Sequence, residues 1–275
     1  MGEPAMDSFL AEQGLRLTYL RDPSQSEAFD PCRILDDLCN EGMGGAMLPW
    51  QNGLRMAGSD HLVIATGTDD GRCFGVVAAS DMATDREPFL FLDAAYMAPT
   101  ARTSHLLHRM LAFAMLRIAG FSSVPYVLAA CVQTPCYARS LQEFGQRFTL
   151  ASLFPAAPDA VVIDLGMASL ARRIARIVRP GSRHEIAGRF RSAMAAGAAR
   201  YPTRNGANAG PSSHHHTEET LVVIDLSMAH DATILDDARR VYRSRPKTQT
   251  PRGLVAAIGS DALHAPQALP DVTAL

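Results

Sequence analysis

This chain of 275 residues has almost no lysine and no marked excess of charge of either sign. Lys247 is its only lysine, so arginine supplies nearly all of the basic residues, a bias that together with the high alanine content is typical of a GC-rich bacterial genome. The formal net charge is −2, so no overall field attracts the chain to nucleic acid or to a membrane surface. We do not expect nucleic acid as a partner.

Long apolar runs and paired cysteines are also missing. No apolar segment reaches the length of a membrane span. Residues 1–14 contain acidic residues without a continuous apolar stretch, so we expect neither a membrane span nor a signal peptide. The five cysteines form no close C-x-x-C pair, and their odd number argues against a disulfide framework. A reducing, cytoplasmic location is the simplest interpretation.

The composition that remains is that of a globular protein, with 47% hydrophobic and 20% charged residues. Apolar periodicity and turn residues divide the first part of the chain into strands and helices. Strands are expected at residues 15–20, 61–66, 73–79, 89–97, 126–132, 148–154 and 160–165, and helices at residues 26–41, 50–56, 103–119 and 135–144. Turn residues at 67–71 predict a hairpin between the second and third strands. Thr103 or Ser104 is the expected cap of the third helix, which is apolar on most sides and should be buried against a sheet.

The pattern changes after Met167. Residues 195–213 are rich in Ala, Gly, Asn and Ser, which is typical of a flexible linker. A helix is expected at 170–178, a strand at 221–226, a helix at 231–244 and a short strand at 253–258. We therefore expect a domain at residues 1–168, an Arg-rich helix and linker at 169–219, and a C-terminal strand–helix extension at 220–275.

One eight-residue segment returns later in the chain. Residues 161–168 read VVIDLGMA, and residues 222–229 read VVIDLSMA. A duplicated strand–helix unit would explain this echo, and so would the ordinary frequency of β-branched strands that end in Asp before a helix. The second copy could lie beside the first and extend the sheet, or pair with a neighbouring subunit in a homodimer.

The strand at 89–97 leads through Pro99 into the long apolar helix, and such a junction can hold an anion on the first N–H groups of the helix. This junction and the order of elements over roughly residues 15–167 resemble the GCN5-related N-acetyltransferase (GNAT) superfamily. The resemblance implies an α/β fold with a mixed, mostly antiparallel central sheet flanked by helices. The C-terminal extension would be an addition to that fold.

The resemblance also implies a coenzyme A site, because the family holds the pyrophosphate of coenzyme A in a (Q/R)-x-x-G-x-(G/A) loop after this strand. It assigns acetyl-CoA or another acyl-CoA, without a metal, to Met97 and to the matching residues Arg102, Thr103, Ser104, His105, Leu106 and Leu107. His105 and Leu107 stand where the family has glycines. Coenzyme A therefore sits differently, another acyl carrier is used, or binding has been lost. A well-capped buried helix without a ligand is the other interpretation.

The family often has a Glu on this strand as a general base that acts through water. Asp93 is the only carboxylate here. The period of two places Phe91, Asp93 and Ala95 on one face, and apolar neighbours would raise the pKa of Asp93. A pairing with Arg or a backbone cap is the alternative role.

The family's general-acid Tyr falls at Leu141, so that Tyr is absent. Tyr137, one turn earlier, and Tyr96 are the candidates in its place, and packing between sheet and helix is the alternative for both. Cys131 and Cys136, near His105 and His108, allow an acyl-cysteine route, and inert buried cysteines are the alternative. The run His214–His216 is interpreted as solvated, because its loop offers a metal no fixed geometry.

Two functions follow. The first is an N-acyltransferase that depends on acyl-CoA or an acyl carrier and acts on a small-molecule amine or a peptide. The second is a catalytically inactive GNAT-like binding or regulatory protein. It would act through the second copy of the echo or through residues 169–204, where nine arginines accompany one acid.

Overall fold

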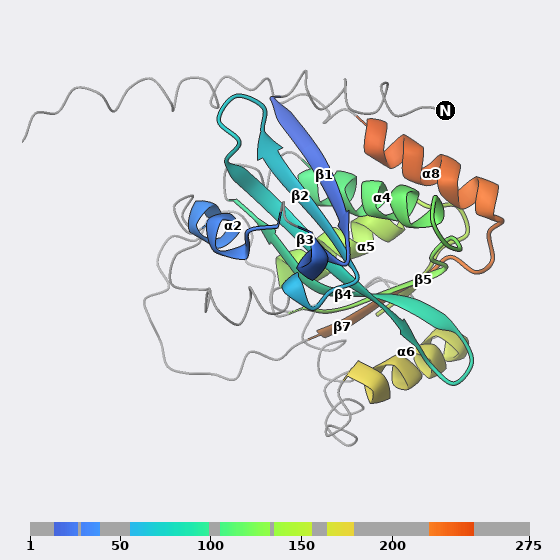
Figure 1. Cartoon of the computed structure of the whole chain (residues 1–275). Coiled ribbons are helices and arrows are strands. Elements are labelled where there is room, and N and C mark those ends of the chain that lie inside the picture. The colour runs from blue at the N-terminus through green and yellow to red at the C-terminus, as the bar shows by residue number, and fades with distance from the viewer. Residues whose placement is uncertain are drawn as a thin grey trace, which may run out of the picture. The chain divides into compact units, whose positions relative to one another are not determined.

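The computed structural model describes residues 14–26, 29–38, 56–98, 105–132, 135–155, 164–178 and 220–244. Seven strands form one sheet in the order β1-β2-β3-β4-β5-β7-β6 (Figure 1). They are β1 (Leu15–Arg21), β2 (His61–Gly67), β3 (Cys73–Ala83), β4 (Pro88–Met97), β5 (Val127–Val132), β6 (Ser152–Phe154) and β7 (Thr220–Asp225). Only β4 and β5 run parallel, and every other neighbouring pair is antiparallel. The predicted mixed, mostly antiparallel sheet is confirmed.

Helices cover both faces of this sheet. They are a short 3-10 helix η1 (Pro23–Gln25) and the α-helices α2 (Pro31–Leu38), α4 (Leu106–Ala119), α5 (Pro135–Gly145), α6 (Leu165–Val178) and α8 (Asp231–Arg243). Among the described helices, none combines the length and the apolar character that crossing a membrane requires.

The buried side chains form three clusters that show which helix lies on which face. The main core packs α4, α5 and α8 against one face of the sheet. On the other face, the α2 cluster holds α2 against β2, β3 and β4, and the α6 cluster holds α6 against β4, β5 and β7. The alternation along β2 confirms the assignment, because Val63 lies in the main core while its neighbours Leu62 and Ile64 lie in the α2 cluster.

The described part of the segment expected as a C-terminal extension, residues 220–244, lies inside this fold. β7 lies between β5 and β6 and pairs with both. α8 packs along α4, with the rings of Phe113 and Tyr242 stacked at 5.8 Å between centroids. Four residues of α8 belong to the main core, namely Ile234, Ala238, Val241 and Tyr242. β7 and α8 therefore complete the sheet and its core, and do not form an appendage.

Several expected boundaries are corrected. The strand expected at 148–154 covers only Ser152–Phe154. The strand expected at 160–165 falls partly outside the described residues, and Leu165 already begins α6. The helix expected from residue 26 starts at Pro31, because the Asp30 carboxylate accepts the N–H groups of Cys32 and Arg33 at 3.0 and 3.1 Å. Residues 50–55, the linker at 195–213 and the strand expected at 253–258 lie outside the described residues.

Candidate functional site

A β-bulge at Asp93 interrupts the pairing of β3 with β4. Ala78 pairs with Ala94, but the next residue, Ala79, pairs with Leu92, so that Asp93 is the additional residue on β4. A bulge bends the strand and redirects the side chain at its centre. Bulges are over-represented beside functional sites, where they serve this purpose.

The bulge also corrects the predicted face of this strand. Phe91 packs with the α6 cluster, whereas Ala95 packs with the main core on the opposite face. The expectation that Phe91, Asp93 and Ala95 share one face is therefore wrong. One additional residue shifts the period of two and exchanges the faces of everything that follows.

The parallel ladder between β4 and β5 ends beside the bulge. Its pairs run from Leu90 with Leu128 to Leu92 with Ala130. Beyond them, β4 continues to Met97 and β5 to Val132 without further pairs. The two strands therefore separate toward their carboxyl ends, and Asp93 is the first residue of β4 in the separated part.

The Asp93 carboxylate is half-buried and held from the neighbouring strand. The Ser80 hydroxyl on β3 donates to Asp93 Oδ2 at 2.6 Å. A hydroxyl donor at this distance restricts the rotation of the carboxylate. The structure thus places one oriented carboxylate where β4 leaves β5.

The first turn of α4 has an unusual start. Its N-cap is His105, with φ 54° and ψ 23°, and no side chain caps the helix there. This corrects the expected cap at Thr103 or Ser104, which lie outside the described residues together with Arg102. The left-handed region favours glycine, and a residue with a Cβ pays about 1 kcal/mol to enter it. His105 thus has a left-handed backbone conformation, which glycine adopts readily, at the position where the coenzyme A loop pattern has its first glycine.

The side chains that follow His105 belong to the protein interior. Leu106 and Leu107 are 1% and 8% exposed and lie in the main core. Met97 lies there too, with its sulfur over Gly75, where an added Cβ would approach it to 2.8 Å. Their side chains therefore pack the fold. Leu106 and Leu107 can contact a ligand through their backbone N–H groups. These N–H groups lie in the first turn of the helix, where no carbonyl of the helix accepts them.

His108 connects the helices that follow the two separated strands. It lies on the first turn of α4, and its Nε2 is 2.8 Å from the Ser140 carbonyl oxygen of α5. Burial lowers the pKa of His108 to about 4, so the imidazole is neutral at neutral pH and its Nε2–H donates to that carbonyl. Burial and then Arg147 also lower the pKa of His105, whose ring centroid lies 5.6 Å from that of His108.

Tyr96 lies in the separated part of β4 and Tyr137 on the first turn of α5, and their side chains pack on opposite faces of the sheet. Tyr96 packs against the α2 cluster and Tyr137 against the main core. Burial, and then the nearby Tyr96, raises the pKa of Tyr137 above its ordinary value. Leu141, at the family's Tyr position, is a core residue with 1% exposure.

The remaining candidates are the two cysteines and the histidine run. Cys136 is exposed on the first turn of α5, and Cys131 is half-buried at the end of β5. The acyl-cysteine route through them stays a prediction. No three His, Cys, Asp or Glu side chains of the described part of the chain lie close enough to hold a metal ion, and His214–His216 lie outside it.

No protein-family model matches the chain, and neither does any curated protein. Among solved structures, the chain is similar to the diaminobutyrate acetyltransferase EctA from Paenibacillus lautus, solved in complex with its substrate L-2,4-diaminobutyric acid and coenzyme A. That match has 15% identity and a TM-score of 0.39, and it covers 78% of this chain and 96% of the other. It is also similar to a protein described as a phosphinothricin N-acetyltransferase, with 16% identity and a TM-score of 0.35 over 53% of this chain and 90% of the other. Both TM-scores are too low to establish a shared fold by themselves.

Proposed function

We propose that this protein is an N-acyltransferase that moves an acyl group from a thioester of coenzyme A, or of an acyl carrier, to an amine. The observation that carries the proposal is a coincidence of two features on β4. The parallel ladder ends at Leu92, and the bulge places the carboxylate of Asp93 at the next position. The strand then continues toward the N-terminus of α4, where an anion can bind.

The residues present fit a diphosphate ligand at the start of α4. His105 has the left-handed backbone that a glycine adopts readily, so its side chain does not prevent a tight turn at the start of α4. The N–H groups of Leu106 and Leu107 would hold the phosphates, with the positive end of the helix dipole behind them. Arg102, Thr103 and Ser104 complete the proposed set.

The chemistry assigned to this chain is positioning and proton transfer. A thioester carbonyl between the separated strands would be polarised by backbone N–H groups. As the amine nitrogen bonds to the carbonyl carbon and the carbon–sulfur bond breaks, Asp93 would accept the amine proton through water. Burial raises the pKa of Tyr137, so its hydroxyl is a poor proton donor to a leaving thiolate whose thiol has a pKa of about 8.5. The sulfur would leave as a thiolate and take its proton from solvent, while the hydroxyls of Tyr137 and Tyr96 would donate hydrogen bonds to it.

Calorimetric titration of the full chain with acetyl-CoA, hexanoyl-CoA, longer acyl-CoA esters and acyl carrier protein tests the donor site. Thiol release in the presence of an amine panel and a peptide panel tests transfer. Asp93→Asn should leave donor binding unchanged and lower the transfer rate by roughly 10²- to 10⁴-fold. Asp85→Asn, an exposed carboxylate on the turn before β4, is the matched control. Absence of binding by every donor would overturn the proposal.

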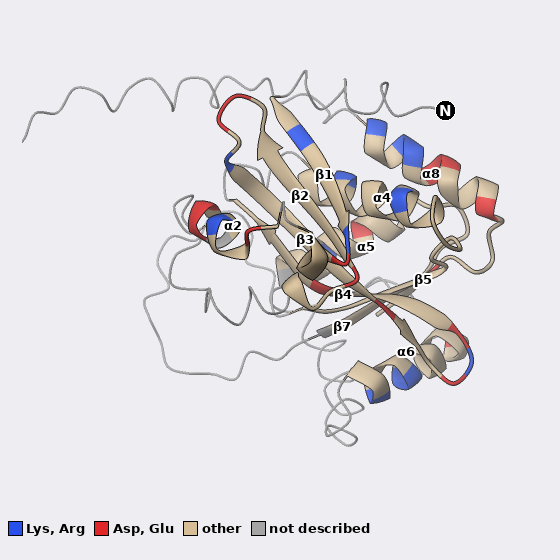
Figure 2. Cartoon of the chain, viewed as in Figure 1, with Lys and Arg blue, Asp and Glu red and all other residues tan. Residues whose placement is uncertain are grey.

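The alternative of a binding protein without catalysis receives little support from the described part of the Arg-rich segment. Arg173 is held by Glu87, with Nη2 2.7 Å from Oε1, and so stabilises the packing of α6. Arg172 and Arg176 are exposed on the same helix. Figure 2 shows basic positions in blue along α6. Donor binding without transfer to any amine would favour this alternative.

A further inference from the structure

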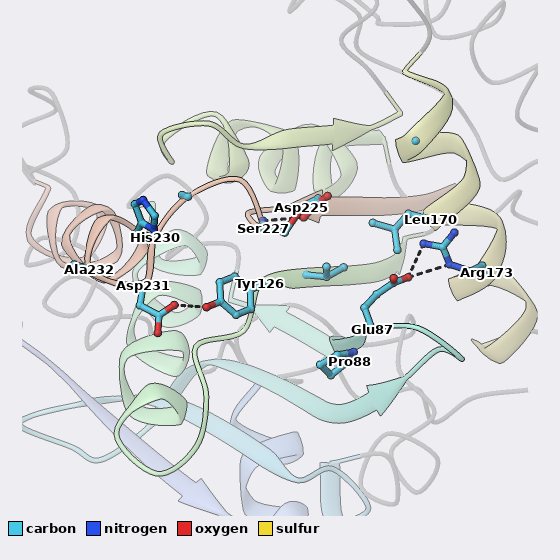
Figure 3. Close-up of a pocket in the computed structure, with 13 residues that line it drawn as sticks. Glu87, Pro88, Tyr126, Leu170, Arg173, Asp225, Ser227, His230, Asp231 and Ala232 are labelled. Atoms are coloured by element: carbon cyan, nitrogen blue, oxygen red, sulfur yellow. Dashed lines mark hydrogen bonds and ion pairs between the residues drawn. The ribbon is translucent and has the colours of Figure 1, made fainter.

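A pocket of about 840 Å³ lies at the other end of β4 and β5 (Figure 3). Its walls come from the starts of both strands, from α6, and from the turn that joins β7 to α8. A strand rise of about 3.3 Å per residue puts Pro88, on its wall, roughly 17 Å along β4 from Asp93. The pocket is therefore separate from the proposed transfer site, and its volume lies in the range that small-molecule sites have.

The charges of its walls are unbalanced. Arg173 supplies the pocket's guanidinium, and both its Nε and its Nη2 donate to Glu87 Oε1, at 3.0 and 2.7 Å. Asp225 accepts the backbone N–H of Ser227 at 2.9 Å, and Asp231 accepts the hydroxyl of Tyr126. Among the described residues, no cation offsets these two carboxylates.

Helix dipoles do not reverse this balance. α6 and α8 both begin at the pocket, and the positive end of a helix ordinarily favours an anion. At α6, however, Asp164 Oδ1 accepts the N–H groups of Gly166 and Met167 at 2.8 and 3.1 Å. At α8, Asp231 itself occupies the first turn. Each positive end already faces a carboxylate.

Two exposed apolar side chains are chain neighbours of wall residues. Leu165 directly precedes the wall residue Gly166 and is 78% exposed, and Met228 follows the wall residue Ser227 and is 74% exposed. These exposures exceed those of the other large hydrophobic side chains in the described part of the chain.

We propose that this pocket binds an organic cation, namely a protonated amine with an apolar body. The carboxylates of Asp225 and Asp231 would receive the ammonium group, and the ring face of Tyr126 would add a cation–π contact. The hydrocarbon part would cover Leu170 and extend toward Met228. The inference is independent of the proposed acyl transfer, because it uses none of the residues assigned to that reaction.

Calorimetry on the full chain with hexylamine at neutral pH tests the inference, with hexanoate and hexanol as probes of equal length. Hexylammonium should bind at least tenfold more tightly than either, and added salt should weaken it. Asp225→Asn and Asp231→Asn should each weaken binding roughly fivefold. Asp36→Asn, which alters an exposed carboxylate on α2 outside the pocket wall, should leave binding unchanged.

A second variant keeps the test decisive if an aspartate variant fails to fold. Ala232 is an exposed wall residue on the first turn of α8, and Ala232→Trp should block the pocket without changing its charge, so hexylammonium binding should be lost. Tighter binding of hexanoate, equal binding of all three probes, or full binding by Ala232→Trp would each overturn the inference. Because the donor titrations with acyl-CoA use a separate set of residues, either proposal can fail alone.

Discussion

The two copies of the echo contain the same leucine and methionine, and the structure buries them in opposite ways. In the first copy Leu165 is 78% exposed and Met167 is 4% exposed. In the second copy Leu226 is 0% exposed and Met228 is 74% exposed. Identical residue types at identical spacing therefore do not determine which side chain enters a core.

The difference follows from the period of the structure around each copy. The first copy enters α6, whose buried side chains are Met167, Leu170 and Ile174 at helical spacing. The second copy continues β7, where Val222, Ile224 and Leu226 alternate into the main core. A period near 3.6 buries the methionine, and a period of 2 buries the leucine.

The comparison is tested most strongly at the two leucines. Leu226→Ala should lower the free energy of unfolding by roughly 3 to 4 kcal/mol, because it leaves a cavity in the main core. Leu165→Ala should change it by less than about 0.5 kcal/mol. Urea denaturation of the two variants measures both, and equal losses would contradict the assigned periods.

Two histidines extend the comparison, because burial again separates residues of one type. Burial lowers the pKa of His108 to about 4, against 6.5 for the unfolded chain. Between these pH values the unfolded chain binds the additional proton, so stability falls as the pH falls from 6.5 to 4. The expected loss through His108 is about 3 kcal/mol.

His108→Gln should remove this part of the pH dependence, measured as the unfolding free energy at a series of pH values. His105→Gln is the matched control, since the side chain of His105 is much less buried than that of His108 and should contribute less. The same acid profile in His108→Gln and in the unmodified chain would show that another group causes it.

The aspartates of the two echo copies, Asp164 and Asp225, both accept backbone N–H groups of the turn that follows, and substitutions there test how much this shared turn contributes to stability. Asp164 accepts two backbone N–H groups and Asp225 accepts one. Removal of a cap costs about 1 kcal/mol, so Asp164→Ala should destabilise the protein by about that amount and Asp225→Ala by less. Thermal unfolding of both variants gives the order, and a larger loss at Asp225 would mean that the shared turn matters more in the strand copy.

The smallest effect on stability is expected at His105, where the substitution changes the cost of a backbone conformation. His105→Gly should stabilise the protein by about 0.5 kcal/mol, because removal of the left-handed cost of about 1 kcal/mol outweighs the destabilisation that the greater chain entropy of glycine in the unfolded state causes. His105→Ala, which keeps that cost, should show no gain. A destabilised His105→Gly would indicate that the imidazole contributes more than the backbone does.

Much of the fold was predictable because it depends on local pattern. The hairpin of β2 and β3, the buried helix α4 and the start of α5 at Pro135 all follow from turn residues and apolar spacing. The face of Asp93 was not predictable, because a bulge arises from the register between two strands and no residue of β4 signals it. His105 gave no signal either, since a capping residue is ordinarily recognised by its side chain.

By itself the sequence determined the sheet-and-helix class, the strand that carries Asp93, and the local turn at each echo aspartate, because these depend on residues within one or two turns of each other. Only the tertiary structure decided that β7 lies between β5 and β6, that the ladder of β4 and β5 ends beside a bulge, and that two echo copies meet at one pocket. Strand pairing joins residues far apart in the chain. Which strands pair depends on the apolar surface that the complete fold buries, and a local segment of sequence does not contain that information.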